Sequence, residues 1–305
     1  MIPLNVSIVG AGYWGKKVIR ETLDIAQTTG GVNLYSIVDN SPSMLEQCRK
    51  EFGPLNYRLS YDDLLYDPAA SAVHICSPNN THFELASKFL RSKKHVLVEK
   101  PLALRAREAE ELVRLAETSR RVLSVGHVHR FNNGVKELKR VVDSGILGDI
   151  YYLRFRWTGF LPVQHDRDVI TEHPDGVNAS IELSWLDLEK HRDVTAVGSE
   201  AVARLNCLDQ KLILQKPDKT ETIMAIPSNT LREEIIHFAG CVDSNSESKP
   251  YANLSDGILG TGVVRLLETA KRSLREERTV QVPLPESEEL VAGESTGTVF
   301  RRLAN

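Results

Sequence analysis

A lysine that could transfer protons, Lys100, follows an apolar run at His95–Val98. A glycine-rich turn, Gly10-x-Gly12-x-x-Gly15, follows another apolar run near the start of the chain. In an open α/β sheet, ligands bind at the edge where the carboxyl ends of the strands meet, so we expect the amine and the turn to share a crevice. A dinucleotide and a proton-transferring amine in one place predict a hydride-transfer enzyme.

The glycine turn has the strand, turn and helix context of a dinucleotide site. Gly10 permits the tight turn, Gly12 lets the backbone approach a pyrophosphate, and Gly15 allows close packing of helix on strand. Asp39 ends the next predicted strand, where its carboxylate can accept hydrogen bonds from the adenosine ribose hydroxyls. Because Asp39 would repel a 2′-phosphate and no arginine follows it directly, we predict NAD as the cofactor, with NADP less favoured.

A polar loop, Cys76–His82, leaves a third predicted strand and enters a helix. It has two interpretations. It is either a capped turn stiffened by Pro78, or a loop under the nicotinamide ribose that offers Ser77, Asn79 and His82 as cofactor contacts.

Lys100 is flanked by Glu99 and Pro101. A lysine at a strand end is usually only solvated, but a lysine beside a cofactor can hydrogen-bond to a substrate hydroxyl. Pro101 fixes the backbone after it, and a cis bond there would re-aim the lysine. We therefore predict that Lys100 is a catalytic residue that also contacts the substrate, and that Glu99 lies in the cofactor site.

Two histidines, His127 and His129, follow the last strand of this pattern and face the same way on an extended segment. They could hold a metal ion, but no third ligand lies near them in the sequence, so we predict no metal site. We expect His127 to contact the cofactor, and Arg130 and Asn132 to contact the substrate.

The 305 residues suffice for two domains. Alternation of buried strands with helices predicts a parallel Rossmann sheet over residues 1–126. Strands separated by turns predict a mostly antiparallel sheet domain over residues 127–305. That second domain is expected to close with two helices, Leu231–Val242 and Ile258–Glu277, and a strand at Thr279–Pro283. The predicted fold class is therefore α/β followed by α+β.

Composition excludes several classes of function. The net charge of −3, with no basic cluster, argues against nucleic-acid binding. No window approaches about 18 consecutive apolar residues, so we expect no membrane span. The four cysteines have no metal-like spacing, and the start of the chain lacks the pattern of a signal peptide. These features predict a cytoplasmic protein.

Together these motifs resemble the Gfo/Idh/MocA oxidoreductase family. The segments that carry the resemblance are Gly10–Gly15, Ser77–His82, His95–Pro101, Gly126–Asn132 and Asp256-Gly257. The resemblance implies NAD-linked hydride transfer at a sugar, nucleotide-sugar or cyclic polyol carbon, assisted by Lys100. It adds Tyr13 and Trp14 of the glycine turn to the cofactor site, and it implies a homodimer or homotetramer formed through the second sheet.

The sequence departs from the family in one segment. Members usually carry an Asp-x-x-x-His pair on a helix after the first strand of the second domain, but no such pair occurs between residues 158 and 176, where the helix is expected to be missing. His165 could substitute as the second catalytic acid/base, or it could lie in a solvated polar loop. The alternative function is a catalytically impaired NAD-binding protein that acts as a redox sensor or assembly partner.

Overall fold

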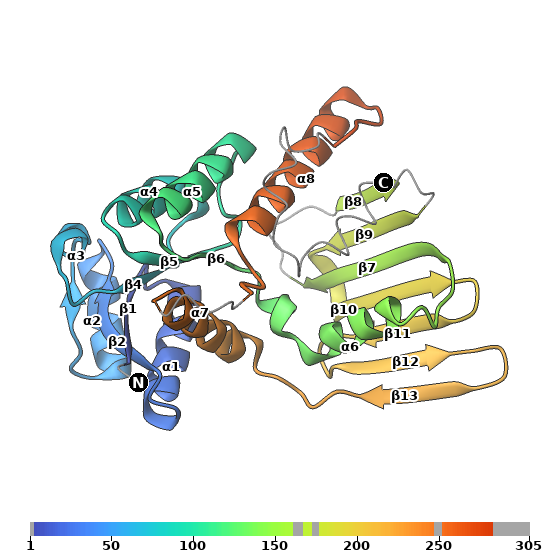
Figure 1. The fold of residues 1–305 in the computed structure, drawn as a ribbon, viewed down its shortest axis with the longest axis horizontal. Coiled ribbons are helices and arrows are strands. Elements are labelled where there is room, and N and C mark those ends of the chain that lie inside the picture. The colour runs from blue at the N-terminus through green and yellow to red at the C-terminus, as the bar shows by residue number, and fades with distance from the viewer. Residues whose placement is uncertain (1–2, 161–166, 173–176, 247–251, 283–305) are drawn as a thin grey trace. The chain divides into compact units, whose positions relative to one another are not determined.

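A six-stranded parallel sheet forms the centre of the first of two units into which the chain divides (Figure 1). The computed structural model describes residues 3–160, 167–172, 177–246 and 252–282. Within these ranges the first unit comprises Met1–Val128 and the segment that starts at Leu231, and the second unit is His129–Thr230.

The strand order of the first sheet is β3-β2-β1-β4-β5-β6, and every pairing is parallel. Its strands are β1 (Leu4–Val9), β2 (Val32–Val38), β3 (Tyr57–Arg58), β4 (Ala72–Ile75), β5 (His95–Glu99) and β6 (Leu123–Gly126). The chain adds strands on one side of β1 and then on the other, so the order reverses between β1 and β4. Ligands of doubly wound sheets bind at such a reversal, outside the carboxyl ends of the strands.

Helices cover both faces of this sheet. They are α1 (Tyr13–Thr28), α2 (Pro42–Phe52), α3 (Asp62–Tyr66), α4 (His82–Arg91), α5 (Ala106–Ser119), α7 (Thr230–Ser246) and α8 (Gly257–Glu276), with a short 3-10 turn η1 (Asn79–Thr81). Alternate residues of a strand face opposite sides. Accordingly, Val96 and Val98 of β5 pack in one core cluster with α4 and α5, whereas Leu97 packs in the other with α1 and α7.

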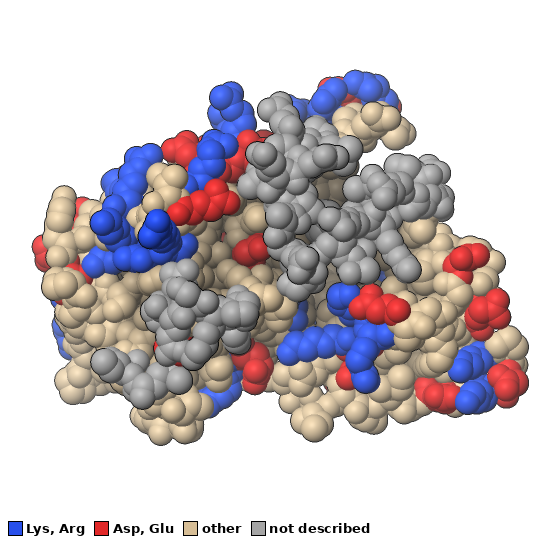
Figure 2. All heavy atoms as spheres, viewed as in Figure 1, with Lys and Arg blue, Asp and Glu red and all other residues tan. Residues whose placement is uncertain are grey.

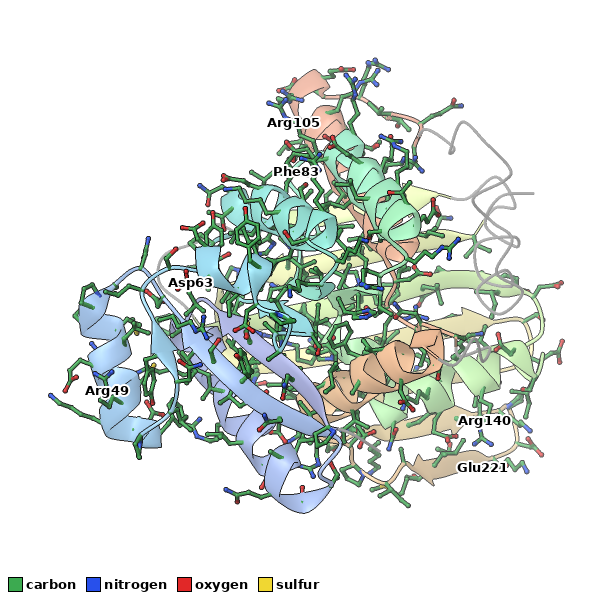
Figure 3. All side chains as sticks on the ribbon, turned by 60° about the vertical axis from the view of Figure 1, so that its left-hand side comes forward. Arg49, Asp63, Phe83, Arg105, Arg140 and Glu221 are labelled. Carbon is green, nitrogen blue, oxygen red and sulfur yellow. The ribbon has the colours of Figure 1, made fainter. Side chains whose placement is uncertain are left out.

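Local sequence explains where α2 begins and ends. The hydroxyl of Ser41 accepts a hydrogen bond from the Met44 amide, and Pro42 occupies the first turn, where no amide donor is needed. The helix ends at Gly53, whose φ of +80° suits glycine. Its outer face is charged, and Arg49 points away from the sheet (Figure 3).

The second unit is built on a seven-stranded sheet of order β13-β12-β11-β10-β7-β9-β8. Its pairings are antiparallel except the parallel pair β7–β9. The strands are β7 (Ile150–Phe160), β8 (Arg167–Glu172), β9 (Asn178–Ser184), β10 (Leu186–Gly198), β11 (Val202–Asn206), β12 (Lys211–Gln215) and β13 (Thr220–Met224). The turn η2 (Val128–Phe131) and helix α6 (Asn133–Asp143) precede the sheet, and α6 packs Leu138 and Val141 against one face.

The predicted fold class, a parallel Rossmann sheet followed by a mostly antiparallel sheet, is confirmed. The last two helices, however, belong to the first unit rather than to the second domain. They do so because α7 buries Leu231, Ile235 and Phe238 in the same core as α1, and α8 buries Val264 beside α5. The first unit thus ends at Val128, close to the predicted division at residue 126, and resumes at Leu231.

Two further elements differ from the prediction. The two-residue strand β3 was not expected, because it is too short to carry a periodicity. Residues 279–282 form no strand, since within the described residues they pair with no neighbouring strand.

The surface carries both signs of charge. On the face that Figure 2 shows, Lys and Arg side chains are interspersed with Asp and Glu. Among the described helices, none is long and apolar enough to cross a lipid bilayer.

Candidate functional site

The glycine turn between β1 and α1 combines crowded and open positions. Gly10 has φ +98°, and a Cβ there would lie 2.7 Å from the Ser77 amide nitrogen. A Cβ on Gly15 would lie 2.0 Å from the Gly10 carbonyl oxygen. A Cβ on Gly12, by contrast, would meet no atom within 4 Å. Gly10 and Gly15 are thus required by packing, whereas Gly12 leaves space at the start of α1 in which a pyrophosphate fits.

Asp39 fastens this turn to the end of β2. Its two carboxylate oxygens accept hydrogen bonds from the amides of Ala11, at 2.8 Å, and Ser41, at 2.9 Å. Each oxygen has a further lone pair, so the half-buried carboxylate can still accept from ribose hydroxyls. The predicted cofactor residue therefore also shapes the turn that it serves.

The loop after β4 is braced from within the chain. His82 is 1% exposed, and its two ring nitrogens lie 2.8 Å from the Pro101 carbonyl and 2.9 Å from the Ser77 carbonyl. Both ring nitrogens of His82, a residue that we predicted to contact the cofactor, thus hydrogen-bond to backbone carbonyls. Asn79 is exposed, and the Ser77 hydroxyl bonds to that of Thr81 at 2.6 Å. His82 joins the β4 loop to the loop that carries Lys100.

Glu99 and Lys100 point in opposite directions at the end of β5. Glu99 is 8% exposed and accepts a hydrogen bond from the Trp14 indole at 2.5 Å. A Cβ at Gly126 would lie 2.7 Å from a Glu99 carboxylate oxygen, so glycine alone fits beside it. Lys100 is exposed, and within the described part of the chain its amine forms no hydrogen bond or ion pair. The Lys100–Pro101 peptide bond is cis.

Tyr13, the remaining predicted contact of the glycine turn, is 80% exposed at the start of α1. The Lys17 ammonium lies 4.4 Å from its ring centre. The ring is therefore accessible beside the open position at Gly12.

Sequence reasoning missed the buried residues around Glu99. The ring of His74 lies 3.2 Å from the Glu99 carboxylate, and donor atoms of His74, Cys76 and Glu99 all lie within 4.8 Å of one another. Alternation along β4 and β5 was the available signal, because it places these side chains on the same face of the sheet. Burial, together with the charges of Glu99 and Glu234, raises the pKa of the Cys76 thiol well above its usual value. Glu99 already accepts a hydrogen bond from Trp14 and lies against the His74 ring, so two of these three groups have partners within the protein.

Glu234 of α7 is a buried carboxyl group without a partner. It is 1% exposed, and neither carboxyl oxygen has a hydrogen-bond partner within the described residues. Burial, and then the negative charge of Glu99, raise its pKa well above the usual value. No local motif marks this residue, because the packing of α7 on the first sheet brings it there from a distant part of the chain.

The predicted contacts after β6 fall in both units. In the first unit, His127 lies 3.3 Å from the hydroxyl of buried Ser255. In the second unit, Asn132 caps α6: it accepts from the Val135 amide and donates to the Cys207 carbonyl. Asn132 is 1% exposed, so the structure uses as a helix cap a side chain that we predicted to contact substrate. Arg130 is half-buried in η2, and His165 lies outside the described residues.

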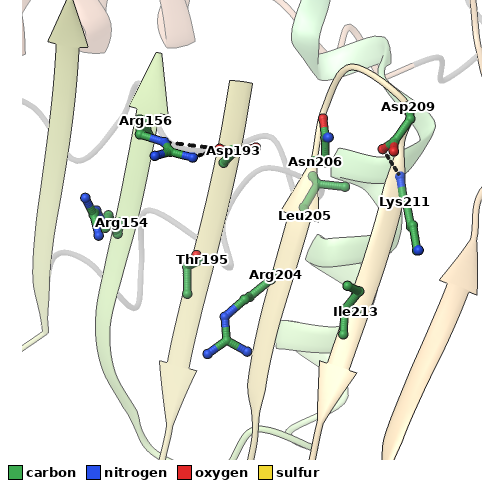
Figure 4. Close-up of a pocket in the computed structure, with 10 residues that line it drawn as sticks. All are labelled: Arg154, Arg156, Asp193, Thr195, Arg204, Leu205, Asn206, Asp209, Lys211 and Ile213. Carbon is green, nitrogen blue, oxygen red and sulfur yellow. Dashed lines mark hydrogen bonds and ion pairs between the residues drawn. The ribbon is translucent and has the colours of Figure 1, made fainter. Parts of the chain in front are cut away.

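The second unit carries a pocket of about 470 Å³ on the sheet face opposite α6 (Figure 4). Its lining is Arg154, Arg156, Asp193, Thr195, Arg204, Leu205, Asn206, Asp209, Lys211 and Ile213. Its arginines have partners on the sheet. Arg156 pairs with Asp193 at 2.7 Å, and Arg154 pairs with Glu182 at 3.0 Å. Two of the four cationic side chains that line the pocket, Arg154 and Arg156, are thus neutralised by ion pairs.

The turn, the acid after β2 and the lysine after β5 all follow strands at the carboxyl edge of one parallel sheet, the edge at which doubly wound sheets bind their ligands. A family model described as an oxidoreductase family with an NAD-binding Rossmann fold, GFO_IDH_MocA, matches residues 4–127. Oxidoreductase YdgJ of Escherichia coli is 31% identical over 251 residues, which are 81% of this chain and 68% of that protein. The chain belongs to the Gfo/Idh/MocA family.

Other relatives match over a shorter length. Myo-inositol 2-dehydrogenase of Thermotoga maritima is 32% identical over 50% of this chain, and that match covers 44% of the relative. Among solved structures, an Agrobacterium radiobacter oxidoreductase in complex with NAD+ and L-tartaric acid superimposes with a TM-score of 0.79 at 17% identity. That superposition covers 92% of this chain and 98% of the other. UDP-N-acetylglucosamine 3-dehydrogenase GnnA of Acidithiobacillus ferrooxidans gives a TM-score of 0.74 at 20% identity, over 90% and 98%.

The open space at Gly12 leads to a prediction about cofactor binding. A Cβ on Gly12 would meet no protein atom within 4 Å, so we expect the fold of Gly12→Val to persist while the space for the pyrophosphate is filled. We expect the dissociation constant for NAD, measured by calorimetry, to rise about tenfold or more, because the backbone amides can no longer approach the phosphates. Gly31→Val is the control, since a Cβ there also meets nothing within 4 Å. Wild-type NAD affinity in Gly12→Val would contradict this placement.

The raised pKa of Glu234 predicts how stability depends on pH. The native state holds this proton at pH values where the unfolded chain has lost it, so its contribution to stability falls as pH rises above the usual glutamate pKa. The loss per group is at most about 1.4 kcal/mol for each pH unit. In Glu234→Gln we expect the free energy of unfolding, measured with urea, to fall less between about pH 5 and pH 8 than in the wild type. Parallel pH profiles would show that Glu234 does not bind this proton.

Proposed function

We propose that the protein is an NAD-dependent oxidoreductase that acts on a hydroxyl-bearing carbon of a sugar, nucleotide sugar or cyclic polyol. One observation carries the proposal. The open turn at Gly12, the carboxylate of Asp39 and the exposed amine of Lys100 all follow strands of one parallel sheet, at its carboxyl edge. A crevice of this kind can bring a substrate carbon to a cofactor and a proton acceptor together.

Lys100 has the chemistry for the proton step. In the oxidation direction the substrate carbon loses a hydride and its hydroxyl loses a proton, and a carbonyl forms. NAD, when bound, supplies the acceptor for the hydride. The neutral amine of Lys100 takes the hydroxyl proton, and in reduction the ammonium returns it to the carbonyl oxygen. An exposed amine with no competing partner among the described residues can make that hydrogen bond without breaking another.

Glu99 is the proposed positioning residue for Lys100. Its carboxylate accepts a hydrogen bond from Trp14 and lies beside His74. These contacts hold the end of β5, after which Lys100 follows. His82 fixes the following loop through the Pro101 carbonyl. Ordered supports of this kind hold a reactive group in place before the substrate arrives.

The substrate class is proposed from the names of the relatives. They include inositol 2-dehydrogenase of Salmonella typhimurium and D-glucoside 3-dehydrogenase of Escherichia coli, which match about half of this chain. His165 remains the proposed second acid/base, and Arg130 a proposed substrate contact. We also propose a homodimer or homotetramer formed through the sheet face opposite α6, which no described helix covers.

Loss of the Lys100 amine should abolish most turnover. In Lys100→Ala we expect kcat to fall about 10²- to 10⁴-fold, the usual contribution of a general acid/base, with NAD affinity unchanged. The assay follows absorbance of the reduced nicotinamide with myo-inositol, methyl glucoside and UDP-N-acetylglucosamine as substrates. Lys50→Ala, an exposed lysine on α2, is the control. Full turnover in Lys100→Ala would exclude this role, and NAD binding without turnover by the wild-type protein on any substrate would favour a redox sensor.

Asp39 should set the preference for NAD over NADP. In Asp39→Asn the side chain keeps its size but loses the charge that repels a 2′-phosphate. We therefore expect the dissociation constant for NADP, divided by that for NAD, to fall about tenfold or more, because a repulsion between charges at short range is removed. An unchanged ratio would show that the carboxylate does not face the adenosine ribose.

A further inference from the structure

A cluster of cationic and aromatic side chains lies on the second unit, outside the pocket of Figure 4. The guanidinium carbon of Arg192 lies 5.4 Å from the ring centre of Trp157 and 6.0 Å from that of Trp185. His129 packs edge-on against Trp157, with ring centres 4.7 Å apart. We name these residues, together with Lys190, the Arg192 cluster.

The ladder of β7 and β10 explains why these side chains meet. Arg192 and Trp157 are directly paired across the two antiparallel strands, so their side chains share one face. Lys190 is two residues earlier on β10, and a Cβ on Gly159 would lie 3.9 Å from its side chain. The cluster therefore occupies the sheet face on which α6 packs.

Hydrogen bonds to the backbone hold Arg192 in place but involve only one of its guanidinium nitrogens. One of its terminal nitrogens donates to the carbonyls of Thr158 and His191, both at 2.6 Å. Within the described residues its other two guanidinium nitrogens make no hydrogen bond. A fixed guanidinium with free donors on its edge can bind a carboxylate or phosphate through two parallel hydrogen bonds.

Among the residues that the structure describes, the cluster has no counter-ion. The acids of β10 point to the other face of the sheet, where Asp193 pairs with Arg156 and Asp187 accepts from the Thr158 hydroxyl. Among the described residues, neither Arg192 nor Lys190 forms an ion pair. Burial, followed by the charges of Arg192 and Lys190, lowers the pKa of His129. Arg192 therefore offers an anion both its charge and two neighbouring indole rings, which suits an anionic ligand that also presents a ring.

We propose that the Arg192 cluster binds the anionic group and the ring of a sugar acid or sugar phosphate, with the anion on Arg192 and the ring against an indole. The inference rests on the proposed function for the class of ligand, a sugar. Neutral polyols and glucosides lack the group that Arg192 binds, so the cluster would select the anionic members of that class. The indoles present apolar faces to the C–H face of the sugar, while His129 and Lys190 offer polar contacts to its hydroxyls.

Binding can be measured without turnover. The full-length protein with NAD is titrated with glucuronate, glucose 6-phosphate and glucose, and the fluorescence of Trp157 and Trp185 reports binding because both rings border Arg192. We expect at least one of the two anionic sugars to bind about ten- to a hundredfold more tightly than glucose, the range for hydrogen bonds to a charged group. The two anions distinguish a carboxylate from a phosphate ligand.

Variants separate this site from general charge effects. Arg192→Met should remove the preference for the anionic sugar, and Arg192→Lys should retain part of it. Arg154→Met is the matched control, because Arg154 lies on a neighbouring strand but on the opposite face. Trp185→Leu should weaken the binding of anionic and neutral sugars alike, because both kinds of sugar place their ring against an indole. Far-ultraviolet circular dichroism and NAD affinity check that each variant is folded.

Each result decides the inference. A preference for anions that is lost in Arg192→Met and kept in Arg154→Met supports it. Equal binding of charged and neutral sugars, no binding of either, or an anion preference that survives Arg192→Met overturns it. NAD-linked turnover of any sugar would leave the proposed function standing whatever the result for the cluster, whereas anion binding that is lost in Arg192→Met would support the cluster even where no sugar is turned over.

Discussion

The carboxylate of Glu99 joins three separate elements at the edge of the first sheet. It ends β5, accepts a hydrogen bond from Trp14 at the start of α1, and lies beside His74 of β4. A buried carboxylate is stable only when such partners replace water, so these contacts fix how closely the three elements approach. The alternation of side chains then turns Lys100 outward. The position of the amine is thus a consequence of how its neighbour is buried.

The packing of α7 places a second carboxyl group in the same region. Glu234 faces the buried side of Glu99 without a hydrogen-bond partner among the described residues, and it is held there by the apolar contacts of Leu231, Ile235 and Phe238. An unpartnered buried carboxyl group destabilises the native state. Burial of the rest of α7 offsets that cost, and the group avoids a larger one by keeping its proton. The result is a region of low dielectric behind Glu99, in which its bonds to Trp14 and His74 are strengthened.

Local patterns predicted much of the fold and part of the site. The close packing at Gly10 and Gly15 could be predicted because the turn in which they lie requires glycine at both positions. The bounds of strands such as Val202–Asn206 could be predicted because the periodicity of the strand and the turns beside it are local features of the sequence. The packing of α7 on the first sheet depends on contacts between segments that are distant in the sequence. For this reason, local patterns could predict neither the unit to which α7 belongs nor the burial of Glu234.

The positions of polar residues near the site could be predicted, but the groups to which they hydrogen-bond could not. His82 and Asn132 were expected to contact ligands, yet both are buried and bond to backbone groups. A sequence shows that a polar side chain is available near a site. It does not show which unpaired backbone groups compete for that side chain, because those groups are created by the tertiary fold.

The two faces of the second sheet show why ion pairing, rather than charge count, distinguishes a binding surface. Arginines occur on both faces, but Arg154 and Arg156 are paired with acids, whereas Arg192 lies between two indoles with free donors within the described residues. A paired arginine must give up an existing partner to bind an anion, so little net free energy is gained. Arg192 has no such partner to give up, and its backbone bonds already hold it in place. On this ground we infer that Arg192 is better placed to bind an anion than Arg154 or Arg156 on the opposite face.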